Sequence, residues 1–297
     1  MINNKVLIVK DLCKNINKAS ILKNISFDIE ENEILGFIGP NGSGKSTTMK
    51  CIAGLYHPTS GSIVINGYDI YEDREDALSQ MGVSIENPAL YPNLTGKEHF
   101  DMVAKWKKLD NARIKEMEYF SGLNDDLKKE VRHYSMGMKQ RLILSLAMMT
   151  KPKLLILDEP TNGLDPQAII DLRKKLLDIR NEGTSILLSS HQLSEVDKLV
   201  DRIIFIKYGQ LIAHKTIEQL HQKHISYKLN TSDNQKAQNV LKKYKVIQNK
   251  EYISLEYNSE YEFSNVINLL VKNNISIFTI KERVQDLEEF YQNLYQG

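Results

Sequence analysis

Residues 39–47 constrain this chain more than any other stretch of its sequence. They are Gly-Pro-Asn-Gly-Ser-Gly-Lys-Ser-Thr, and they follow an apolar run at residues 34–38. Glycines let the backbone curl until successive N–H groups point inward, and a helix that begins at Lys45 would add the positive end of its dipole. The stretch therefore predicts a loop between a strand and a helix that binds the phosphates of a nucleotide.

Two side chains of this loop have expected roles of their own. Lys45 would reach the β- and γ-phosphates, and the Ser46 hydroxyl would bind Mg²⁺. The residues that we expect to hold the nucleotide are Gly39, Pro40, Asn41, Gly42, Ser43, Gly44, Lys45, Ser46 and Thr47.

The composition limits the classes of function. The 297 residues can form one large domain and a small one, and 39 Lys and Arg against 38 Asp and Glu give no overall attraction to nucleic acid. The two cysteines, Cys13 and Cys51, cannot build a disulfide framework or a zinc site and suit a reducing cytoplasm. No apolar run approaches a membrane span, so a partner would have to supply one.

Two buried strands are expected to end in polar side chains. Residues 154–157 are apolar and lead directly into Asp158 and Glu159, while residues 185–190 lead into His191. Ligands of parallel α/β sheets bind at the carboxyl ends of the strands. A histidine alone is more often a hydrogen-bonded structural residue, but the place of His191 at a strand end favours a role in the site.

The stretch between these motifs is expected to be mainly helical, from about Lys97 to Ile143. Phe100 would face a core, with Trp106 packed beside it. Ser135 is a candidate N-cap for a helix that runs to about Thr150 and supplies a second helix N-terminus able to receive a phosphate.

Taken together, the order of these motifs resembles the ATP-binding subunit of an ABC transporter. Residues 39–47 are similar to the Walker A motif, residues 135–140 to the signature motif and residues 154–159 to Walker B. Residues 162–165 are similar to the D-loop, and His191 to the switch histidine. The likeness covers about residues 1–220.

The resemblance implies that two such domains enclose ATP between them. Ser135 and Gly137 of one copy would close over the ATP on the loop of the other. Asp165 would contact the nucleotide site across the interface.

The resemblance also implies roles in hydrolysis. Asp158 would hold Mg²⁺ through water, Glu159 would act as general base and His191 would contact the γ-phosphate.

The sequence departs from the family pattern around the same nucleotide. Glu86 stands where the family usually has Gln, and we expect it to take part in catalysis and in binding the metal. Ile16 stands where an aromatic residue usually stacks on adenine, a contact worth ~1–3 kcal/mol, so nucleotide binding should be weaker or less selective for the base. The signature motif reads Ser135-Met136-Gly137-Met138 and lacks its usual second glycine.

Residues 85–95 and 138–140 are more specifically similar to the ATPase subunits of lantibiotic-immunity and bacitracin-resistance exporters, including the glutamate at position 86. This likeness implies export of an antimicrobial peptide through separate membrane permease subunits that dock near residues 86–100. The protein would then lie on the inner face of the cell membrane.

The expected fold is an α/β P-loop NTPase of the ABC-ATPase type, with a RecA-like core, an antiparallel β subdomain and a helical subdomain. This domain would span residues 1–222, with the helical subdomain at about 88–150. After this domain, apolar residues again recur at the spacing of strands and helices. This pattern predicts a ferredoxin-like α+β accessory domain at residues 223–297.

Other functions remain open at the level of sequence. A soluble ABC-type ATPase acting on nucleic acid or ribosomes usually has two cassettes, long coiled coils or zinc cysteines, and none is visible in the sequence. An ABC exporter of another substrate and a nucleotide-binding regulator without turnover are further alternatives.

Overall fold

The computed structural model describes residues 4–86, 90–222, 225–244, 246–248, 252–256, 260–284 and 287–296. The chain forms two compact units, Met1–Lys215 and Thr216–Gly297. The sequence placed the domain boundary after residue 222, which is the end of the short helix α8 (Ile217–Gln222).

A six-stranded sheet in the order β10-β9-β3-β8-β7-β6 forms the centre of the first unit. The neighbouring strands from β9 to β6 are parallel. Every residue of β3, β7 and β8 is buried, which explains why their sequences are almost continuously apolar. The bounds are β3 Ile34–Ile38, β6 Met81–Ser84, β7 Leu154–Asp158, β8 Ser185–Ser189, β9 Arg202–Lys207 and β10 Gln210–Thr216.

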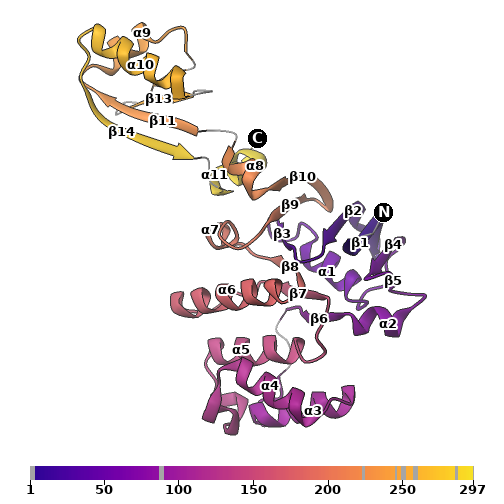
Figure 1. Cartoon of the computed structure of the whole chain (residues 1–297). Coiled ribbons are helices and arrows are strands. Elements are labelled where there is room, and N and C mark those ends of the chain that lie inside the picture. The colour runs from indigo at the N-terminus through magenta and orange to yellow at the C-terminus, as the bar shows by residue number, and fades with distance from the viewer. Residues whose placement is uncertain are drawn as a thin grey trace. The chain divides into compact units, whose positions relative to one another are not determined.

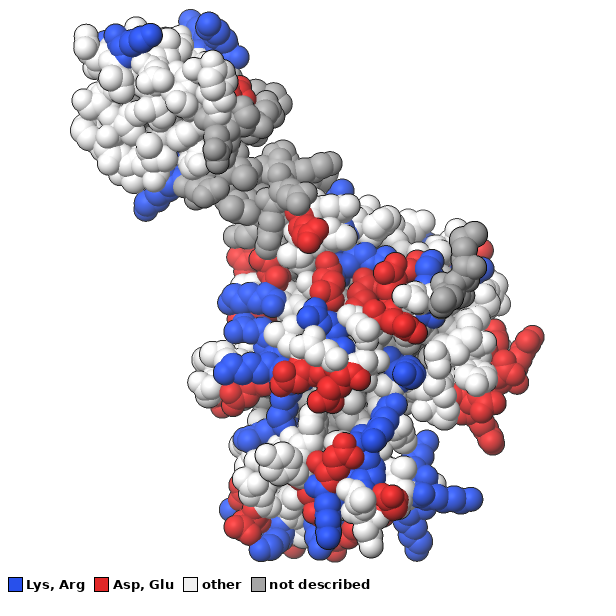
Figure 2. All heavy atoms as spheres, viewed as in Figure 1, with Lys and Arg blue, Asp and Glu red and all other residues white. Residues whose placement is uncertain are grey.

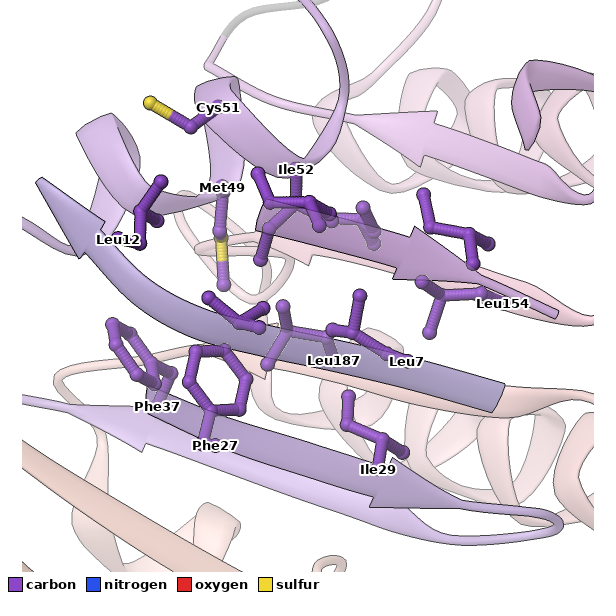
Figure 3. Packing of buried hydrophobic residues seen from close by; sticks show 14 of the residues in the cluster. Leu7, Leu12, Phe27, Ile29, Phe37, Met49, Cys51, Ile52, Leu154 and Leu187 are labelled. Atoms are coloured by element: carbon purple, nitrogen blue, oxygen red, sulfur yellow. The ribbon is translucent and has the colours of Figure 1, made fainter. Parts of the chain in front are cut away.

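A second, antiparallel sheet of the same unit has the order β2-β1-β4-β5. Helix α1 (Lys45–Ile52) joins both sheets in one hydrophobic core, into which Met49 and Ile52 reach (Figure 3). Cys51 is fully buried, and burial raises its pKa to about 11, so this thiol is a packing residue. The bounds are β1 Lys5–Ile16, β2 Ala19–Glu30, β4 Ser60–Ile65 and β5 Tyr68–Asp69.

A group of helices, α3, α4 and α5, packs together at the bottom of Figure 1, below α6 and the parallel sheet. Thr95 caps α3 in a capping box with Glu98, and Ser135 caps α5, as predicted. The helices of the unit are α2 Arg74–Ser79, α3 Gly96–Lys107, α4 Asn111–Ser121, α5 Met136–Ala147, α6 Pro166–Asn181 and α7 Leu193–Val196, with 3-10 turns η1 Asn124–Lys128 and η2 Val131–His133.

The expectation for Trp106 was wrong. Phe100 and Ala104 lie four residues apart on one face of α3 and are buried, whereas Trp106 is 66% exposed. At 100° per residue, position 106 is turned well away from the face of Phe100, so the helix period separates them.

After α8, the second unit has the strand and helix order β-α-β-β-α-β and then a last helix. Its sheet has the antiparallel order β12-β13-β11-β14, which is the ferredoxin-like arrangement. Leu229, Leu255 and Val266 are in its own core. The bounds are β11 Ile225–Thr231, α9 Asn234–Val240, β12 Val246–Gln248, β13 Ile253–Glu256, α10 Glu260–Lys272, β14 Ile277–Val284 and α11 Leu287–Gln296.

Candidate functional site

The loop between β3 and α1 can be built only with glycines at its two narrowest points. A Cβ atom on Gly39 would lie 2.3 Å from the carbonyl oxygen of Ile206. Gly44 has a φ of +112°, and a Cβ atom there would lie 2.7 Å from Leu22 Cδ2. The loop backbone is thus held against β9 and β2, and it leads directly into the N-terminus of α1.

The side chain of Lys45 folds back over this loop and is largely buried. Its ammonium group donates to the carbonyl oxygens of Gly39 at 2.7 Å and Pro40 at 3.3 Å. Burial lowers the pKa of Lys45, and the charges of Glu159 and Asp158 oppose that shift. A phosphate group would give this ammonium a charged acceptor in place of neutral carbonyls.

Ser43 provides a further sign that the loop is built for a ligand. Its Oγ atom is buried and has no hydrogen-bond partner within the described ranges. Such an atom usually finds a partner in a native structure, and a phosphate oxygen would supply one.

The ends of β7 and β8 meet because these strands pair in register, with Asp158 opposite Ser189. Ser189 Oγ donates to Asp158 Oδ1 at 2.5 Å and accepts from the backbone N–H of Glu159 at 3.0 Å. The sequence prediction missed Ser189. The sequence feature that could have indicated Ser189 is a polar residue at the end of a buried strand, as Asp158 is on the neighbouring strand.

Glu159 and His191 form a direct pair. The Nδ1 atom of His191 donates to Glu159 Oε2 at 2.8 Å, and the His191 backbone N–H donates to the same oxygen at 3.2 Å. Glu159 has a φ of +52°, which is unusual for a residue with a side chain. The side chain of Glu159 is 21% exposed, so water can reach the predicted general base.

Glu86 contacts a residue that the sequence prediction did not consider. Its Oε1 atom lies 2.5 Å from the ammonium of Lys50 on α1. Glu86 also lines an open cavity of about 730 Å³ with Asp158 and Glu159. The structure therefore brings all three acids to one cavity, with Glu86 bound to a lysine at its edge.

The signature residues and Asp165 lie on the neighbouring helices α5 and α6. Ser135 accepts from the N–H of Met138 at 3.2 Å, and Asp165 caps α6 by accepting from Ala168 at 2.9 Å. Gly137 and Asp165 line a separate cavity of about 160 Å³ between these helices. Within one chain they are therefore not part of the cavity that Asp158 and Glu159 line.

The residues at the loop suit a magnesium ion that comes with a nucleotide. In the parts of the chain that are described, no three His, Cys, Asp or Glu side chains converge to hold a metal ion by themselves. Mg²⁺ does not need such a cage, because it keeps several waters and binds one or two protein oxygens together with phosphates. Ser46 at the start of α1 and Asp158 at the end of β7 offer those oxygens.

Ile16 ends β1 and is 38% exposed. Its side chain offers apolar contact but no aromatic ring on which a base could stack.

The site has the parts of a known family, and comparison with known proteins decides which one. A family model described as ABC transporter matches residues 22–162. The lantibiotic transport ATP-binding protein SrtF of Streptococcus pyogenes is 41% identical over 71% of this chain and 90% of its own length. The chain belongs to the ABC transporter ATP-binding proteins.

The likeness of this ABC protein to its relatives extends beyond the first unit. The bacitracin transport ATP-binding protein BcrA of Enterococcus faecalis is 31% identical over 100% of this chain and 98% of its own. A solved structure described as an ATP-binding subunit of an ABC transporter is 33% identical, with a TM-score of 0.65 over 73% of this chain and 92% of its own.

Family membership establishes the basic activity. The protein binds and hydrolyses ATP as the subunit that powers an ABC transporter, and subunits of this kind work with membrane permease subunits. No helix in the described portion of the chain is long and apolar enough to cross a bilayer.

Lys45→Met should weaken nucleotide binding by roughly 10- to 100-fold, because it removes a charge-assisted hydrogen bond to phosphate. Calorimetric titration with ADP in EDTA measures this without the metal. Lys5→Met is the matched control, since Lys5 forms a surface ion pair with Asp28 at 3.4 Å, away from the loop. An unchanged affinity in Lys45→Met would contradict the predicted phosphate contact.

Proposed function

We propose that this protein powers the export of an antimicrobial peptide from the cell membrane, as part of a bacterial self-protection or resistance transporter. The observation that carries the proposal is the likeness to BcrA over the whole chain, together with that to SrtF. Glu86, in place of the usual amide, fits the same group of exporters.

We propose that the working form is a pair of these domains, from two copies or from a copy and a close relative. Asp158 and Glu159 line one cavity of the chain, whereas Gly137 and Asp165 line another. A second domain that brings its Ser135 and Gly137 over the bound ATP would complete the phosphate contacts with a helix N-terminus. ATP would then hold the two domains together.

The chemistry of hydrolysis in this pair follows from the residues described above. Lys45 and the loop N–H groups hold the phosphates, and Ser46 and Asp158 would hold Mg²⁺, which neutralises the charge of the phosphates. Ser189 orients Asp158 by donating to it at 2.5 Å. Glu159 would accept a proton from the attacking water, and His191, which donates to Glu159, keeps that carboxylate in place and would contact the γ-phosphate.

The permease subunits are proposed to dock at residues 86–100, of which residues 87–89 lie outside the described residues. Glu86, Leu90 and Pro92 of this segment line the same cavity as Asp158 and Glu159. A partner that contacts this segment would therefore act on the wall of the cavity that the two acids line. This arrangement could transmit closure of the site to the membrane subunits, with the protein on the inner face of the membrane.

The main alternative, an ABC-type ATPase that acts on nucleic acid or ribosomes, has less support. In Figure 2, Lys and Arg side chains of the first unit are interspersed with Asp and Glu on the visible face. A protein that follows a phosphate backbone usually gathers its basic residues into a stripe. The balance of 39 basic against 38 acidic residues agrees with this.

Glu159→Gln should reduce ATP hydrolysis by about 10²- to 10⁴-fold, the range for loss of a general base, and should leave ATP binding intact. Incubation with ATP and Mg²⁺ should then produce a stable dimer, which size-exclusion chromatography with light scattering detects. Glu31→Gln, at an exposed turn before β3, serves as the control. Hydrolysis by Glu159→Gln at the unmutated rate would remove Glu159 from this role.

Tyr91→Ala should weaken copurification with the permease subunits from detergent-solubilised membranes, because Tyr91 is a 52% exposed aromatic residue in the proposed docking segment. Tyr119→Ala is the matched control, since Tyr119 is 87% exposed on α4. Equal loss of copurification in both variants would argue against a specific contact at Tyr91.

The cargo can be tested in the source bacterium by replacing the gene with its Lys45→Met allele. Without ATP-driven export, the minimal inhibitory concentration of a lantibiotic or of bacitracin should fall severalfold. That of an aminoglycoside, which acts on ribosomes, should not change. Unchanged sensitivity to every peptide antibiotic tested would contradict the proposed cargo and leave the ATPase activity in place.

A further inference from the structure

Lys50 lies on α1, one helical turn and a half beyond Lys45, and points its charge at Glu86 instead of at the phosphate loop. The two side chains are joined by a 2.5 Å contact between Lys50 Nζ and Glu86 Oε1. Lys50 is the more enclosed partner, with a side chain 17% exposed against 63% for Glu86. The Lys50 side chain is therefore the one held in place by its surroundings, and the exposed carboxylate of Glu86 contacts it.

A second contact fixes the position of Lys50. Its ammonium group lies 5.2 Å from the centre of the Tyr56 ring, within the range of a cation–π interaction. The hydrogen bond to Glu86 raises the pKa of Lys50, so this side chain is fully charged near neutral pH. The helix thus presents a permanent positive charge beside the end of β6.

Glu86 needs such a partner for two reasons. It has a φ of +58°, a backbone conformation that residues with a side chain adopt only when their surroundings hold them there. It also lines the cavity that contains Asp158 and Glu159, and three carboxylates around one cavity repel each other unless cations stand among them.

We propose that Lys50 is a positioning residue that holds Glu86 back from the Mg²⁺ ion and limits how strongly this carboxylate contributes to metal binding. An ion pair with one partner mostly exposed is weak in water, so a divalent ion near Asp158 can compete with Lys50 for Glu86. The inference rests on the proposed Mg²⁺ site. Glu86 carries a charge where the family usually has a neutral Gln, and Lys50 on α1 is the residue that pairs with this charge.

The test measures the affinity for a metal ion and not the rate of ATP hydrolysis. Mn²⁺ in place of Mg²⁺ is titrated into the full chain saturated with ADP, and bound Mn²⁺ is followed by electron paramagnetic resonance. Lys50→Met should increase the Mn²⁺ affinity severalfold, because the released carboxylate becomes available to the metal. Lys50→Arg should stay close to the unmutated protein, since it keeps the charge.

A double-mutant cycle shows whether Lys50 acts through Glu86. In a Glu86→Gln background, Lys50→Met should leave the Mn²⁺ affinity unchanged, because no carboxylate remains to be released. Lys128→Met, which removes an exposed ion pair with Asp125 on η1, is the control for the loss of a lysine. Thermal unfolding of each variant shows that it is folded, and Lys50→Gln replaces Lys50→Met if the latter is not.

The outcomes separate this inference from the proposal on which it rests. An unchanged Mn²⁺ affinity in Lys50→Met would overturn the role of Lys50, as would an equal increase with and without Glu86. If the unmutated protein binds ADP but shows no ADP-dependent Mn²⁺ site, the metal site and the inference both fail.

Discussion

The in-register parallel pairing of β3, β7 and β8 is the constraint on which the rest of the site depends. Asp158 lies opposite Ser189 across the β7–β8 pair, and β3 delivers the phosphate loop at the same edge of the sheet. A shift of one residue would turn every side chain of a strand to the opposite face of the sheet, and because both faces of these strands are buried, it would disrupt the packing on both. The hydrophobic core thus sets the register, and the register sets the distances between the residues of the candidate site.

Much of this could be predicted from the sequence, because the strongest signals are local. The glycines of the loop, the apolar strands with acids at their ends and the Ser135 cap each depend on neighbours within a few residues, and the structure has all of them. The strand and helix order of the second unit also follows from local periodicity.

The rest depends on contacts between distant residues. Lys50 and Glu86 are 36 positions apart, and their pairing leaves no pattern along the sequence. Asp158 and Ser189 are 31 apart, and although each ends a buried strand, only the pairing of the two strands brings them together. Trp106 was misplaced for the opposite reason, since an apolar residue near a helical stripe suggested burial that the helix period does not allow. The docking surface, the pairing of two domains and the metal ligands are properties of an assembly and stay predictions.

The positive φ angles at Glu86 and Glu159 bear on how this sequence is maintained by selection. Glycine would fit either backbone position with less strain, so stability alone favours the loss of both acids. Under the roles proposed for them, activity and not stability keeps glutamate at these positions. A copy of the gene released from its transport duty would therefore be expected to lose these two acids early, and to become more stable as it does so.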